Sequence, residues 1–143
     1  MTHARAERVE PDPWLAAGFL ARAKKFAADG SVETLSPESR QILMHSATVA
    51  GCDAVLAVSG RRIEGSEGGH RLRLTETQLL LAGEHDELFE VLDEARAIRN
   101  EVSYAAGLAA PPDIEETAAA VRELVGLIEE HVTPHLPDWK AES

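Results

Sequence analysis

Apolar residues recur at spacings of three and four along most of the chain, which is the period of an α-helix with one buried face. Four long segments and one short segment show this period. The expected helices cover residues 13–30, 37–59, 75–82, 86–107 and 113–133. No segment alternates between apolar and polar residues as a half-buried strand would. The pattern therefore predicts an all-α fold, a bundle of four long helices plus one short helix in the middle crossover.

Polar residues with helix-capping ability precede the predicted helices. Asp12 and Ser36 are each followed by a proline, the residue that favours the first helical position. Thr75 with Gln78, and Asp113 with Glu116, have the spacing of a capping box. Glycines follow four of the segments and predict their ends: Gly30, Gly60, Gly83 and Gly107. These signals agree with the apolar period on where each helix begins and ends.

The chain divides into one domain and two short tails. Its 143 residues suit a single domain with one hydrophobic core. Residues 1–11 lack periodicity and are expected to form a flexible N-terminal tail, followed by a helical domain over 12–133 and a C-terminal tail over 134–143. Residues 60–71 contain four glycines and predict a loop inside the domain.

Charge and composition exclude several classes of protein. A formal net charge of −11 disfavours coating of DNA or RNA, because phosphates would be repelled. No apolar run approaches the ~20 residues of a membrane span, and the first residues lack the apolar core of a secretory signal. A single cysteine, Cys52, excludes an intramolecular disulfide. We expect a cytoplasmic protein, with no membrane partner, cofactor or metal.

One charged residue interrupts the apolar face of the fourth predicted helix. The face is formed by Leu88, Leu92, Ala95, Val102 and Ala106, and its missing member is Arg99. A guanidinium within an apolar stripe is costly unless it is paired or faces a polar cleft. In the simplest structural interpretation Arg99 pairs with a core carboxylate such as Asp53 or Glu101, or extends its charge to solvent.

In the functional interpretation, Arg99 belongs to a polar corner with Asn100 and Tyr104. The run Arg99-Asn100-Glu-Val-Ser-Tyr104, preceded by Leu92-Asp-Glu-Ala-Arg96-Ala-Ile, resembles the signature helix of the HEPN superfamily. Members of that superfamily are helical bundles whose motif is Arg, a polar residue, three more residues and then His. The order of elements over residues 13–133 is similar too. The resemblance implies an RNA-cleaving or nucleotide-binding site where two motif helices of a homodimer meet.

This chain departs from the motif at Tyr104, which stands where catalytic members have His. A phenol has a pKa of about 10 and is a poor general base near neutral pH, unlike imidazole. Arg99 and Asn100 can still bind a phosphate or ribose oxygen. The variant with Tyr at this place resembles a separate branch of the superfamily.

Three functions follow from this reasoning. The first is a module that binds nucleotide or RNA phosphate with little or no catalysis, through Arg99, Asn100, Tyr104 and Arg96. The second is a metal-independent endoribonuclease at a dimer cleft, with Arg99, Asn100 and Tyr104 as catalytic residues or His45 in place of the lost His. The third is a structural interaction domain with a relic motif. The resemblance implies a toxin–antitoxin, defence or nucleotidyltransferase-partner system, with an antitoxin or nucleotidyltransferase as partner.

Other candidate residues carry weaker signals. Arg61 and Arg62, with Arg71 and Arg73, flank the glycine-rich loop and could form an anion-binding lip beside Arg99; a solvated loop is the alternative. His131 and His135 have the spacing of two metal ligands on one helix, but Pro134 between them makes a zinc site unlikely. Cys52 is most simply a small core residue.

Overall fold

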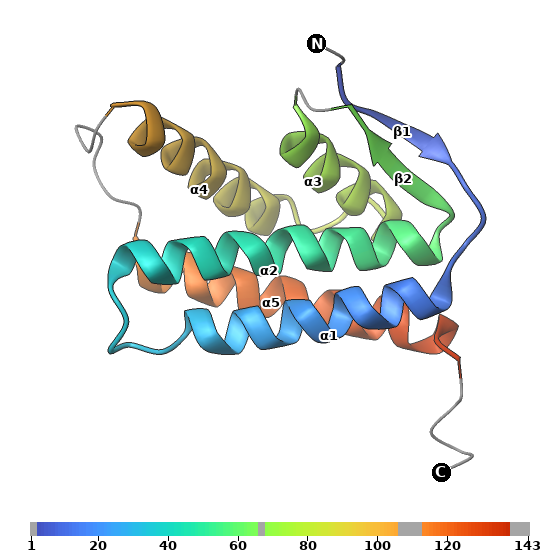
Figure 1. Ribbon diagram of the computed structural model, residues 1–143, viewed down its shortest axis with the longest axis horizontal. Coiled ribbons are helices and arrows are strands. Elements are labelled where there is room, and N and C mark those ends of the chain that lie inside the picture. Colours follow the sequence, from blue (N-terminus) through green and yellow to red (C-terminus); the bar gives the residue numbers. More distant parts are fainter. Residues whose placement is uncertain (1–2, 66–67, 106–112, 138–143) are drawn as a thin grey trace.

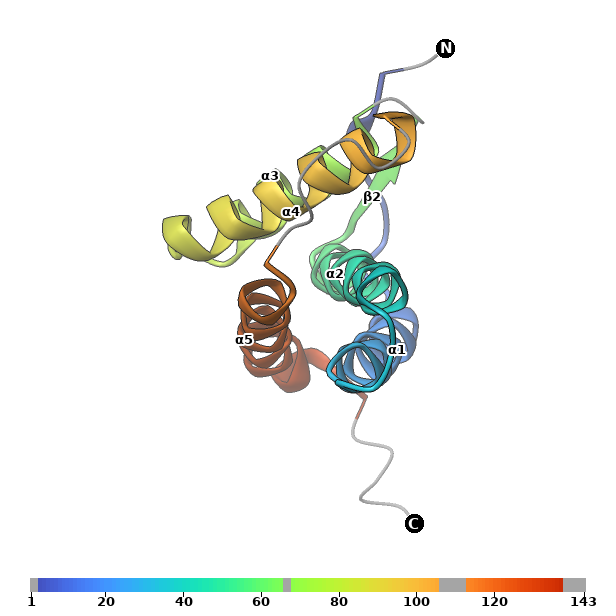
Figure 2. The same ribbon diagram turned by 90° about the vertical axis from the view of Figure 1, so that its left-hand side faces the viewer.

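Three helices lie side by side and form the base of the molecule (Figure 1). The computed structural model describes residues 3–65, 68–105 and 113–137, with side chains described outside 96–105. The base consists of α1 (Pro13–Gly30), α2 (Pro37–Val58) and α5 (Ile114–Val132), which continues into a short 3-10 turn, η1 (Thr133–His135). Figure 2 looks along the three helices and shows them grouped around a common centre. These helices contribute most of the buried apolar residues, and α2 lies against both of the others.

The three base helices begin where the capping residues predict. Asp12, Ser36 and Asp113 each accept a hydrogen bond from the backbone N–H three residues later, at 3.0–3.1 Å. Each cap satisfies one of the backbone donors that the first helical turn leaves without a partner. The prediction of a mostly helical bundle is thereby confirmed, and so are the starts of its base helices.

Two further helices form a second layer above α2 and α5. They are α3 (Gly69–Leu80) and α4 (Asp86–Ala105), joined by a tight turn. Figures 1 and 2 show α4 rising from the base of the molecule toward its C-terminal end. The first half of α4 packs on the base through its buried residues Leu88, Phe89 and Leu92. This confirms the first half of the predicted apolar face; Val102 and Ala106 lie outside the described side chains.

The start of the third helix corrects the sequence prediction. The capping-box spacing of Thr75 and Gln78 predicts a start near Thr75, whereas α3 begins six residues earlier, after Gly68 in a left-handed conformation (φ 77°). The Thr75 hydroxyl instead donates to the carbonyl of Arg71, one turn back. Gln78 donates from Nε2 to the Asp86 carboxylate at 2.7 Å, and so bridges α3 and the start of α4. Packing of the buried Leu74 and Thr77 against α2 extends the helix across the predicted loop.

A two-stranded sheet is the other departure from the prediction. Residues 1–11 were expected as a flexible tail, yet β1 (Arg5–Arg8) pairs antiparallel with β2 (Arg61–Glu64), in the register Arg5 with Glu64 and Arg8 with Arg61. Six of these eight residues are charged, so no apolar alternation announces the strands. Backbone pairing and the ion pairs of Glu7 with Arg5 (2.9 Å) and Arg62 (3.8 Å) stabilise the sheet.

The second helix satisfies the length and composition of a membrane span, which the sequence analysis did not anticipate. Half of its most apolar 18-residue stretch is buried inside the molecule. A central helix of a helical bundle has this property, because it is surrounded by neighbours on several sides.

Candidate functional site

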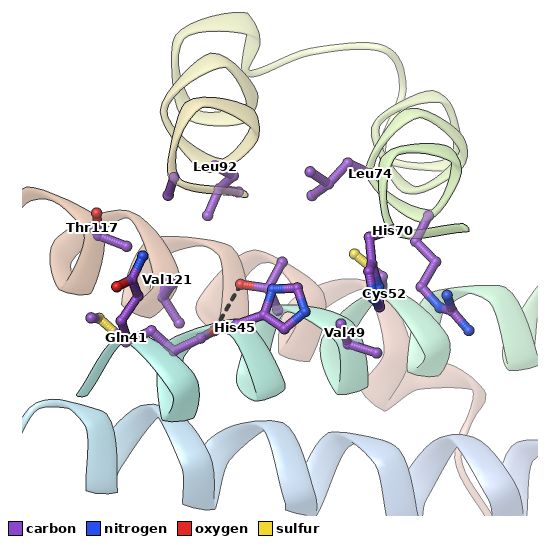
Figure 3. A pocket seen from close by; sticks show the side chains of 13 residues that line it. Gln41, His45, Val49, Cys52, His70, Leu74, Leu92, Thr117 and Val121 are labelled. Carbon is purple, nitrogen blue, oxygen red and sulfur yellow. Dashed lines mark hydrogen bonds between the residues drawn. The ribbon is translucent and has the colours of Figure 1, made fainter. Parts of the chain in front are cut away.

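A small cavity lies between the two layers, under the first half of α4 (Figure 3). We call it the histidine cavity. Its volume is about 30 Å³, enough for roughly two water molecules. Side chains of four helices line it: Gln41, Met44, His45, Thr48, Val49, Cys52, His70, Arg73, Leu74, Leu92, Ala95, Thr117 and Val121. A nucleotide does not fit inside this volume.

Two imidazoles from different helices meet in the histidine cavity. His45 projects from α2, and His70 projects from the first turn of α3. Their ring centroids are 4.7 Å apart and the rings are nearly perpendicular, at 82°. Edge-to-face contact of this kind holds both rings in fixed orientations. Two side chains that each carry ring nitrogens able to donate or accept a hydrogen bond are therefore placed together.

His70 is the site residue that sequence reasoning missed. The glycine-rich segment around it predicts a loop, in which a histidine has no fixed neighbour. Because α3 begins at Gly69, His70 is fixed on a helix instead. The pair Gly68-Gly69 is the one local signal that could have indicated the earlier start. No spacing in the sequence connects His45 to a residue 25 positions later.

A buried amide adds a hydrogen-bond donor to the cavity. The Nε2 atom of Gln41 is buried and has no hydrogen-bond partner among the residues that the structure describes. Buried donors without a partner are rare, because such a donor loses its hydrogen bond to water and gains none within the protein. The Gln41 amide is thus available to a water molecule or to an acceptor group of a ligand.

An ion pair closes one side of the histidine cavity. The Arg73 Nε lies 2.8 Å from the Asp53 carboxylate, and both side chains are about one-fifth exposed. Asp53 was one of the carboxylates considered as a partner for Arg99, and the structure pairs it with Arg73. The neighbouring Cys52 thiol is fully buried, and burial raises its pKa to about 12. This confirms Cys52 as a small core residue and makes it a poor nucleophile.

The motif residues follow directly after the histidine cavity along α4. Ala95 lines the cavity, and Arg99 comes four residues later, about 6 Å along the helix axis at the usual helical rise. The side chains of Arg96, Arg99, Asn100 and Tyr104 lie outside the described part of the structure. His45 and Ala95 line the same cavity, and Ala95 lies one helical turn before Arg99.

Arg61 and Arg62 occupy a different part of the molecule. Both are on β2, beside the C-terminal end of α2, whereas the second half of α4 lies over the N-terminal half of α2 (Figure 1). The interpretation of these arginines as a lip beside Arg99 gains no support from this arrangement. They line a second cavity, at the C-terminal end of α2.

The histidines near the C-terminal end of α5 form a weaker pair. The rings of His131 and His135 are 6.0 Å apart, and partial burial together with the charge of His135 lowers the pKa of His131. Within the described residues, no three side chains of His, Cys, Asp or Glu come together as a metal site.

Comparison of the chain with protein-family models, with curated proteins and with solved structures found no match. The similarity to the HEPN motif rests on the residues quoted above.

Proposed function

We propose that this chain is a HEPN-like module that binds nucleotide or RNA phosphate through Arg99 and Asn100 of α4, with little or no catalysis. One observation supports the proposal most. The helix that carries the motif crosses a cavity holding two imidazoles and an unpaired amide donor, and the motif starts one turn beyond the cavity. Polar groups of α2 and α3 thus lie about one helical turn before the Arg-Asn segment.

Arginine suits this role because its planar guanidinium forms two parallel hydrogen bonds to a phosphate. The acidic chain repels polyphosphate in general, so binding must be local. We expect a short single-stranded RNA or a mononucleotide to bind, and duplex DNA to bind far more weakly. Tyr104 can donate a hydrogen bond to such a ligand but is a poor proton acceptor at pH 7.

The test is a titration of a fluorescent single-stranded RNA with wild type, Arg99→Ala and Arg22→Ala. Arg22 is the matched control, because it is an exposed arginine on α1, in the base of the molecule away from α4. Loss of a charge-assisted hydrogen bond costs about 1.5–3 kcal/mol, so Arg99→Ala should weaken binding by about tenfold or more. Arg22→Ala should change the affinity less than twofold.

Equal RNA affinity of Arg99→Ala and wild type, with a large loss of thermal stability, would contradict the proposal. It would indicate the structural interpretation, because removing one partner of a buried ion pair costs about 3–5 kcal/mol.

A metal-independent endoribonuclease is the second candidate, favoured by the position of His45. The imidazole pair lies beside the motif segment and offers the proton-exchanging group that Tyr104 does not. In that case the same RNA is cleaved in the presence of a chelator, and both Arg99→Ala and His45→Ala abolish cleavage. Binding without cleavage supports the first candidate.

A further inference from the structure

A second cavity lies at the other end of α2, beneath the two-stranded sheet. We call it the sheet cavity. Its volume is about 490 Å³, within the ~300–1,000 Å³ typical of small-molecule sites. It is lined by the β1–α1 connection, α1, α2, β2 and one residue of α3: Val9, Glu10, Asp12, Leu15, Phe19, Asp53, Leu56, Ala57, Arg61, Arg62, Ile63 and Arg73.

Most charges in the wall of the sheet cavity already have partners. Arg73 pairs with Asp53, and Arg62 pairs with Glu64 and Glu7 of the sheet. Asp12 accepts the backbone N–H of Leu15 as the cap of α1. These groups are therefore satisfied without a ligand.

Arg61 differs from the other two arginines of the wall. It is half-buried, and no hydrogen bond or ion pair joins its side chain to any residue within the described part of the chain. A half-buried charge without a partner is costly, because it loses hydration and gains no compensating interaction. Glu10 also lacks a partner, but it is exposed and stays hydrated. Among the charged side chains of the wall, Arg61 is thus the half-buried one without a partner in the described part of the chain.

The strand register adds a second positive charge beside Arg61. Arg8 lies directly opposite Arg61 in the antiparallel pair, so both side chains project from the same face of the sheet. Like charges in opposed positions destabilise a sheet. Arg8 is exposed and does not line the cavity, but an anion bound to Arg61 inside the cavity would reduce this repulsion.

The rest of the wall is apolar. Leu15 is 50% exposed although it lines the cavity, and Phe19 and Ile63 are half-buried. Covering these side chains with an apolar group would remove them from water and stabilise the complex. The Glu10 and Asp12 carboxylates in the same wall would repel a polyphosphate more strongly than a monocarboxylate, because a polyphosphate carries more negative charge.

We infer that the sheet cavity binds a small amphipathic monocarboxylate, with its carboxylate on Arg61 and its apolar part against Leu15, Phe19 and Ile63. The planar guanidinium of Arg61 matches a carboxylate with two parallel hydrogen bonds. This site is separate from the proposed phosphate site on α4, and either can exist without the other.

The experiment is a titration of 3-phenylpropanoate followed by amide NMR shifts and calorimetry, with 3-phenylpropanamide as the uncharged comparator. We expect shifts centred on Val9, Leu15 and Ile63, and at least tenfold weaker binding of the amide. Arg61→Gln should abolish the preference for the carboxylate, and Arg61→Lys should retain part of it because the charge remains.

Arg71→Gln is the matched control, since Arg71 is an exposed arginine on α3 that lies outside the sheet cavity. It should bind 3-phenylpropanoate as wild type does. Equal binding of carboxylate and amide by wild type, or unchanged carboxylate binding by Arg61→Gln, would overturn the inference. Shifts centred on α4 instead would assign the anion to the phosphate site and overturn it as well.

Discussion

The Cys52 thiol is buried in α2, and its chemistry is governed by that burial. Burial, reinforced by the nearby Asp53 carboxylate, raises the pKa of the thiol from 9.0 to about 12, although the Thr77 hydroxyl and Arg73 act in the opposite direction. The neutral thiol is therefore the stable form in the folded protein over the whole neutral range. Alkylating reagents should react with it only when the chain unfolds.

The raised pKa of Cys52 makes stability depend on pH in the alkaline range. Above pH 9 the unfolded chain loses the thiol proton while the folded chain keeps it until about pH 12. The free energy of unfolding should fall as the pH rises through this window, by at most about 1.4 kcal/mol per pH unit. Below pH 9 the thiol should contribute no pH dependence.

Chemical denaturation of wild type and Cys52→Ala between pH 7 and 11 measures this effect. The alanine variant lacks the thiol, so its stability should fall less steeply above pH 9. Parallel curves for the two proteins would show that Cys52 ionises as readily in the folded chain as in the unfolded one.

At the scale of single residues, the sequence predicted which residues are buried or cap a helix better than it predicted which distant residues contact each other. Cys52 as a core residue and the capping roles of Asp12, Ser36 and Asp113 depend on local pattern, and the structure confirms them. The contact of His45 with His70 depends on how α3 lies on α2, which no local pattern encodes. The same holds for the pairing of Asp53 with Arg73.

Arg40 joins three helices at one end of the bundle. Its side chain is 8% exposed; Nε donates to the carbonyl of Gly30, the last residue of α1, at 3.0 Å. A terminal nitrogen lies 2.6 Å from the Glu115 carboxylate in the first turn of α5. One guanidinium thus satisfies a helix-terminal carbonyl and holds an acidic residue at a helix N-terminus.

Arg40→Ala should lower the free energy of unfolding by about 2–3 kcal/mol, because it removes charged hydrogen bonds and buried packing. Lys24→Ala is the control: Lys24 bridges α1 and Glu129 of α5 at 2.5 Å, but both side chains are about half exposed. Exposed bridges contribute about 0–1 kcal/mol. Urea denaturation of the two variants compares them; equal losses would show that burial of Arg40 adds nothing.

At the scale of elements, the long helices were predictable and the short elements were not. Caps and apolar periodicity act within one segment, so they place the base helices α1, α2 and α5 correctly. The β1–β2 pairing joins residues more than 50 positions apart through backbone hydrogen bonds, which leave no trace in side-chain pattern. The early start of α3 depends on contacts with α2 that the sequence does not display.

At the scale of the whole molecule, α4 belongs to the upper layer rather than to the three-helix base. It contacts α3 and α5, and it rises from the base of the molecule toward its C-terminal end (Figure 2). Its predicted apolar face continues past Leu92 to Val102. We expect this face to be completed by a second copy of the chain in a symmetric homodimer.

Light scattering at micromolar concentration should therefore give a dimer for wild type and a monomer for Val102→Asp. Circular dichroism should show the same helix content for both. Leu79→Asp is the control, because Leu79 is an exposed apolar residue of α3, 63% accessible. A monomeric wild type, or dissociation by Leu79→Asp alone, would contradict a dimer through α4.

The two-stranded sheet has two outer edges, and each presents unpaired backbone groups to a passing strand. Arg5 and Glu7 alternate along one strand, and Arg62 and Glu64 do so along the other. An added strand would have to bring its own residues against these charges and strip them of water. Edges built in this way resist aggregation of the sheet with copies of itself. The charges that make the strands unrecognisable in the sequence are thus the same charges that protect the edges of the sheet.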